Sequence, residues 1–110
     1  MLKGKYVRVR LRRYCDDQKP WVFVGRVDQM SENWLALTGK GILIIRGKTR
    51  PVEIDDELRQ MVIPRDNIAN VRVLPDDFGL DEIEVFHEGI RVGIGVKGAP
   101  NTWIGELGES

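Results

Sequence analysis

The stretch from Trp21 to Thr38 constrains this chain most, because it joins two strand-like runs and has a glycine inside the first. The first run, Trp21–Val24, is β-branched and aromatic. A polar tip follows at residues 31–33, and the second run continues over Trp34–Leu37. Gly25 stands where a strand needs a bend, a bulge or a close backbone neighbour. The stretch therefore predicts a strongly bent hairpin, the spine of small β-barrels.

The segment before this hairpin alternates with a period of two, which predicts a half-buried strand over residues 5–14. Val7, Val9 and Leu11 point to one side. The other side is expected to be an exposed row of arginines with a tyrosine at each end: Tyr6, Arg8, Arg10, Arg12 and Tyr14. Such a row suits a phosphate backbone with bases stacked on the tyrosines. Alternatively, it is a solvated strand face with edge protection.

The chain after the hairpin predicts further short strands separated by polar turns. Residues 39–41 (Gly-Lys-Gly) are expected to break the hairpin, and an apolar run resumes at 42–45. A cationic loop occupies 46–51. The remaining strands are expected at 52–54, 60–63 and 68–74, with a tight turn at 64–67.

The last third of the chain predicts a β extension. Apolar residues alternate with polar residues and glycines over Ile90–Lys97, which indicates a strand. Residues 80–88 fit either a helix or the first arm of a hairpin, and the hairpin, turning at residues 87–89, is the interpretation adopted. The tail from residue 99 is expected to be a loop anchored by Trp103 and Ile104.

Composition favours one ordinary globular domain of 110 residues, with 42% hydrophobic and 31% charged residues. The basic start lacks the apolar run of a signal peptide, and no apolar run is long enough to span a membrane. The only cysteine, Cys15, excludes an intrachain disulfide and any cysteine-based metal cluster. A cytoplasmic location with no membrane partner is the expectation.

The net charge is zero, but the two halves of the chain differ. Residues 1–50 carry 12 Lys/Arg against 4 Asp/Glu, and residues 51–110 carry 5 against 13. This asymmetry indicates a basic and an acidic surface, or faces that meet between subunits. The alternative is that interleaved strands mix the charges in space.

The motifs that would indicate an enzyme or a cofactor site stand in the wrong context. A dinucleotide-binding G-x-G-x-x-G needs its glycines between a strand and a helix, but here residues 93–98 overlap a strand. Gly47-Lys48-Thr49 lacks the earlier glycine of a phosphate-binding loop. His87 is the only histidine, which makes a metal site a poor hypothesis. We expect no catalytic residues, no metal and no cofactor.

Residues 4–74 resemble the Sm-like (LSm) family of small five-stranded, SH3-like barrels. The first signature of that family appears as Phe23-Val24-Gly25-Arg26-Val27, followed by Met30 and Leu37. The second appears over residues 62–68 as Val-Ile-Pro-Arg-Asp-Asn-Ile, with Val71 and Val73 beyond. Ser31 and Leu35 stand where the family usually pairs an aspartate with an asparagine, and Pro64-Arg65 stands where it usually has Arg-Gly.

The resemblance implies a mostly β protein, with a barrel over residues 1–75 and a C-terminal β extension over 76–110 on the same domain. It also implies a homo-oligomeric ring that binds single-stranded RNA near the pore. The residues expected to bind are Arg8, Arg10, Arg12, Asn33, Trp34, Arg65 and Asn67. The alternative is an oligomeric structural or adaptor module that binds a protein through the extension and binds no nucleic acid. A monomeric accessory domain of a larger assembly is the third possibility.

Overall fold

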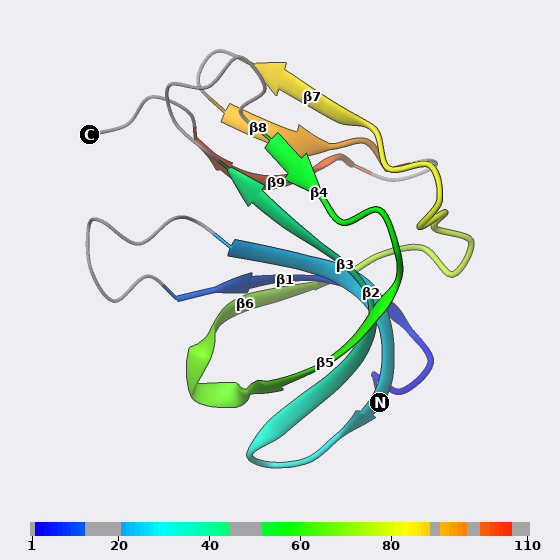
Figure 1. Ribbon diagram of the computed structural model, residues 1–110, viewed down its shortest axis with the longest axis vertical. Coiled ribbons are helices and arrows are strands. Elements are labelled where there is room, and N and C mark those ends of the chain that lie inside the picture. Colours follow the sequence, from blue (N-terminus) through cyan, green and yellow to red (C-terminus); the bar gives the residue numbers. More distant parts are fainter. Residues whose placement is uncertain (1, 13–20, 45–51, 89–90, 97–99, 107–110) are drawn as a thin grey trace.

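A computed structural model describes residues 2–12, 21–44, 52–88, 91–96 and 100–106 of the chain, and it is almost entirely β (Figure 1). The first sheet contains six antiparallel strands, and the second contains three. The elements are β1 (Tyr6–Leu11), β2 (Trp21–Met30), β3 (Trp34–Ile44), β4 (Val52–Ile54), β5 (Arg59–Pro64), the 3₁₀ turn η1 (Arg65–Asn67), β6 (Ile68–Val73), β7 (Val85–Glu88), β8 (Arg91–Ile94) and β9 (Thr102–Glu106). The expected mostly β class is confirmed, and none of the described helices could span a membrane.

The hairpin of β2 and β3 is the longest pairing, and it bends where two glycines face each other. Gly25 lies opposite Gly39. A Cβ on Gly25 would stand 2.5 Å from the carbonyl oxygen of Thr38, and a Cβ on Gly39 would overlap the carbonyl oxygen of Val24. The two backbones therefore approach more closely than any side chain allows. A register shift between Val27 and Gln29 adds a second irregularity on β2.

The expectation that residues 39–41 break this hairpin is wrong. β3 runs without interruption through Gly39, Lys40 and Gly41 to Ile44. The glycines are needed inside the strand because β2 passes so close to it, so here they do not end the strand.

The first sheet has the strand order β4-β3-β2-β1-β6, and β5 pairs with β3. β3 thus pairs with β5 along its first half and with β4 along its second half. In the described residues β5 and β6 form no ladder with each other; η1 connects them. The expected strands at 52–54, 60–63 and 68–74 and the tight turn at 64–67 are confirmed within one residue.

One hydrophobic core lies inside the curve of the first sheet. The alternation of β1 places Val7 and Val9 there with no exposed surface, and Leu11 packs against the same cluster, as expected. The other buried members come from β2, β3 and β5: Phe23, Val27, Leu35, Leu37 and Ile63. Burial of these side chains supplies the main driving force for the curvature.

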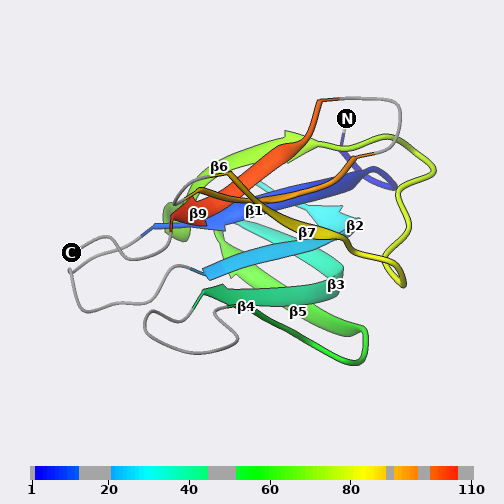
Figure 2. The same ribbon diagram turned by 90° about the horizontal axis from the view of Figure 1, so that it is seen from above.

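A second core lies between the first sheet and the β7–β8–β9 sheet, which covers one end of the molecule (Figures 1 and 2). Val22 and Val24 alternate with Phe23, so β2 is buried on both faces. Facing them are Val92, Ile94 and other apolar residues of the extension. The unbroken apolar run of β2 is explained by this double burial.

The hairpin expected in the extension is confirmed, but it turns later in the sequence. β7 and β8 pair from Val85↔Ile94 to Glu88↔Arg91, so residue 87 belongs to a strand, and the connection falls at residues 89–90, outside the described residues. The expectation of a loop in the tail is wrong, because Thr102–Glu106 forms β9 and pairs with β8.

Candidate nucleic-acid interface

The turn between β2 and β3 lies against η1, and this contact brings together residues that are about thirty positions apart in the sequence. The backbone N–H of Arg65 donates to the carbonyl oxygen of Asn33 over 2.9 Å. The Arg65 guanidinium donates through Nη1 to the carbonyl oxygen of Ser31 over 3.3 Å. Trp34 pairs with Pro64 at the end of the β3–β5 ladder. Three of the expected residues, Asn33, Trp34 and Arg65, therefore share one site.

Ser31 builds the turn that presents Asn33 and Trp34. Its hydroxyl accepts from the backbone N–H of Asn33 (3.2 Å) and from that of Trp34 (3.3 Å), and its own N–H donates to the carbonyl of Trp34. A hydroxyl that accepts backbone N–H groups replaces the aspartate common in such turns. The Ser31 hydroxyl thus holds this turn at a position where the resemblance implied an aspartate.

A small cavity of about 170 Å³ opens between these turns. Trp34 and Arg65 contribute a ring and a guanidinium plane, and the rest of the wall is apolar: Leu2, Met30, Leu35, Ile68 and Val71. The volume is below the roughly 300–1,000 Å³ of sites that enclose a small molecule. A half-buried tryptophan beside an exposed arginine is instead suited to a planar group stacked at the surface.

Arg12 and Asn67 adjoin the same turn. The backbone N–H of Arg12 donates to the carbonyl oxygen of Asn67 over 2.7 Å, and the Arg12 Nε donates to the carbonyl oxygen of Ile68 over 3.2 Å. Arg12 is exposed, so its guanidinium is available to solvent beside η1. The structure therefore places five of the seven expected residues around one pair of turns.

The expectation that Arg8 is exposed is wrong. Only 8% of Arg8 is accessible, because β9 covers this part of β1. The Arg8 Nε donates to the hydroxyl of Thr102 over 2.9 Å, and Nη1 donates to the side-chain oxygen of Asn70. Burial, followed by the charges of Arg10 and Arg72, lowers the pKa of Arg8 to about 10. The side chain remains charged at neutral pH.

Arg10 faces the same side as Arg8 and is half-buried. The arginine row of β1 is thus divided: Arg12 reaches η1, Arg8 contacts Thr102 of β9, and Arg10 lies opposite Asn70 of β6. Tyr6, the first tyrosine of the expected row, packs against the second core, and Tyr14 lies outside the described residues. The alternation of β1 could not show this division, because the strand that covers Arg8 is 94 residues away.

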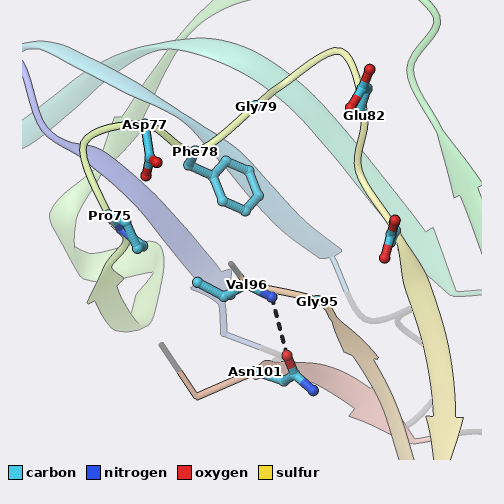
Figure 3. Close-up of a pocket in the computed structure, with 9 residues that line it drawn as sticks. Pro75, Asp77, Phe78, Gly79, Glu82, Gly95, Val96 and Asn101 are labelled. Atoms are coloured by element: carbon cyan, nitrogen blue, oxygen red, sulfur yellow. Dashed lines mark hydrogen bonds between the residues drawn. The ribbon is translucent and has the colours of Figure 1, made fainter. Parts of the chain in front are cut away.

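The largest cavity among those described, about 580 Å³, is acidic (Figure 3). Three carboxylates line it, from Asp77, Glu82 and Glu84, together with Phe78, whose ring points toward Val96. The remaining wall residues are Pro75, Gly79, Gly95 and Asn101. Carboxylates without a lining cation repel phosphate, so this cavity is unsuited to nucleic acid. These carboxylates are not grouped closely enough to hold a metal ion, and neither is any other set of three such side chains among the described residues.

Sequence reasoning missed Leu2, Met30 and Val71 as walls of the smaller cavity, and it missed Arg72 beside Arg8. Of these, Met30 and Val71 carried a signal, because both belong to the signatures on which the resemblance depends. Comparisons of the chain with models of protein families, with characterised proteins and with solved structures find no match.

Proposed function

We propose that the chain is a ring-forming Sm-like protein that binds single-stranded RNA at the paired turns of β2–β3 and η1. The observation that carries this proposal is the hydrogen bond from the Arg65 N–H to the Asn33 carbonyl, because it joins the two turns into one surface. Trp34 would stack on a base, and Arg65 and Arg12 would contact phosphates. The cavity of about 170 Å³ between the turns would receive part of the stacked base.

The strand arrangement supports the barrel and the ring within this proposal. The order β4-β3-β2-β1-β6, with β5 on β3, leaves β5 and β6 as edges on either side of η1, while β4 is a third edge on the second half of β3. The β5 and β6 edges carry exposed valines, with Val62 62% and Val73 49% accessible. Two edges on one molecule permit head-to-tail pairing, which closes into a ring when the rotation allows it.

The proposal is tested by the fluorescence anisotropy of short oligouridine and oligoadenine at several salt concentrations. Trp34→Ala should weaken binding by about 1–3 kcal/mol and leave the salt dependence unchanged, because it removes stacking. Arg65→Gln and Arg12→Gln should each lower the slope of log K against log salt by about 0.7, the value for one phosphate contact on a single strand. Arg26→Gln, at an exposed arginine of β2 outside the site, is the matched control.

Wild-type binding weaker than roughly 100 μM at low salt would contradict the RNA proposal, because nonspecific cationic binding alone is usually tighter. The adaptor alternative would then lead. The apolar face of β7–β8–β9 is already buried on the first sheet, so an adaptor surface would have to use the acidic side of residues 81–96.

A further inference from the structure

Three arginines lie on one face where β1 and β6 meet β9. Arg8 is directly opposite Arg72 in the β1–β6 ladder, and Arg10 is opposite Asn70. Residues opposite each other in a ladder share a face, as do residues two positions apart along a strand. The side chains of Arg8, Arg10, Arg72 and Asn70 therefore form a single group, which we call the arginine cluster.

No ion pair joins the arginine cluster to a carboxylate among the side chains that the structure describes, which do not include those of 103–106 in β9. The two ion pairs found there are Lys5–Asp76 and Arg59–Asp55, and both involve other residues. Arg8 is held by neutral oxygens of Thr102 and Asn70. Arg72 donates through Nη1 to the carbonyl of Asn101 over 2.8 Å and through Nη2 to that of Pro100 over 2.5 Å.

Holding several arginines together without a counter-charge costs free energy. Like charges directly opposite in a ladder destabilise it, and a buried charge without a counter-charge costs free energy. The lowered pKa of Arg8 has these same two causes, burial first and then Arg10 and Arg72. The hydrogen bonds to neutral groups fix Arg8 and Arg72 in place, which reduces the entropy that a ligand must remove.

We propose that the arginine cluster binds a phosphate-class anion at the junction of β1, β6 and β9. Arg10 and Arg72 are half-buried and reach solvent, so they would contact the anion, while Arg8 supplies charge from the buried side. Guanidinium groups suit this role because they bind phosphate oxygens in pairs. The site is separate from the turns that carry Trp34 and Arg65, which lie at the other end of the molecule from β9 (Figure 1).

The test is isothermal titration calorimetry with inorganic tripolyphosphate at constant ionic strength. Arg10→Gln and Arg72→Gln should each weaken binding about tenfold or more, the value of one hydrogen bond to a charged group. Arg26→Gln should bind like the wild type. Arg10→Gln is the main variant because the described hydrogen bonds of the cluster do not involve Arg10, so its fold should be intact. Equal binding by Arg10→Gln and wild type, or no wild-type binding, would overturn the proposal.

A second arm distinguishes the source of the phosphate. Oligouridine without a terminal phosphate is titrated into wild type, Arg10→Gln and Trp34→Ala. If Arg10→Gln weakens oligouridine as much as tripolyphosphate, the site takes the phosphates of a nucleic-acid backbone. If it weakens tripolyphosphate alone, the site takes a free phosphate compound. Trp34→Ala should leave tripolyphosphate binding unchanged in either case, which separates this site from the proposed RNA interface.

Discussion

Gly25 and Gly39 show how two residues without side chains set the shape of the first sheet. Each lies where a Cβ would meet the backbone of the other strand, and backbone cannot move aside as a flexible side chain can. The close approach lets the β2–β3 hairpin bend around the hydrophobic core that lies inside the curve of the first sheet. A side chain at either position must separate the strands or straighten the bend.

Gly25→Val and Gly39→Ala are therefore expected to lower the free energy of unfolding by about 1–3 kcal/mol each, the scale of overpacking. Gly79→Ala is the control, because a Cβ there has no atom within 4 Å. Urea denaturation measures all three. Equal midpoints for Gly39→Ala and Gly79→Ala would show that the bend does not depend on the glycine pair.

The charge of Arg8 predicts an unusual pH dependence. Its native pKa of about 10 is below the ordinary value for arginine, so the native state releases this proton more readily than the unfolded state does. The cost of burying the charge is present in full below the native pKa and is relieved as the pH rises through it. Wild type should therefore gain stability relative to Arg8→Met between about pH 9 and about pH 11.

The stability of wild type is compared with that of Arg8→Met because every other titratable group is common to the two proteins. Chemical denaturation at three or four pH values gives the difference directly. A constant difference, or one that favours Arg8→Met as the pH rises, would contradict the assignment of a buried charge.

At the scale of elements, the period of two in β1 correctly predicted its buried face, because Val7 and Val9 depend only on strand geometry. The apolar run of β2 and the turn at Pro64–Asn67 were equally local signals. The burial of Arg8 could not be predicted from local sequence, since it depends on β9, a strand near the end of the chain. The residues that meet at the turns could therefore be predicted from the sequence, but the exposure of the arginines along β1 could not.

β9 was missed because little in its sequence resembles a strand. Within Thr102–Glu106, only Trp103 and Ile104 suggest one, and a glycine follows them. Tertiary contacts determine the element instead: it pairs with β8, and Thr102, which is 1% exposed, binds the guanidinium of Arg8. Such pairing overrides a weak intrinsic preference.

Thr102→Val tests this contact because it removes the hydroxyl and keeps the shape. The buried Arg8 Nε would lose its acceptor, so we expect the free energy of unfolding to fall by about 1–3 kcal/mol. Thr102→Ser keeps the hydroxyl and should recover most of that loss. Hydrogen exchange should show faster opening of β8 and β9 in Thr102→Val. Unchanged exchange there would mean that β9 is held by strand pairing alone.

At the scale of the whole molecule, β2 contributes side chains to both hydrophobic cores, the one inside the curve of the first sheet and the one between the two sheets. Phe23 and Val27 face the core inside the first sheet, whereas Val22 and Val24 face the extension. The two sheets should therefore unfold together. The charge asymmetry of the chain has a partial spatial counterpart. The arginine cluster lies on β1 and β6, while Asp77, Glu82 and Glu84 line the cavity of the extension.

The assembly proposed for the molecule depends on the β5 and β6 edges, and lysine on an edge strand opposes pairing. Val62→Lys should block the β5 edge, and Val73→Lys should block the β6 edge. In a head-to-tail ring every contact uses one edge of each kind, so either variant alone should be monomeric by light scattering. Leu58→Lys, which changes an exposed leucine in the turn before β5, is the matched control and should keep the wild-type mass.

Mixing the two variants gives the sharper test, because each retains the edge that the other lacks. The β6 edge of the Val62→Lys copy can pair with the β5 edge of the Val73→Lys copy, but the remaining edges are both blocked. The mixture should therefore stop at a heterodimer, which only a head-to-tail contact produces. A symmetric contact between two β5 edges would instead let Val73→Lys associate on its own. A monomeric wild type at micromolar concentration would exclude the ring altogether.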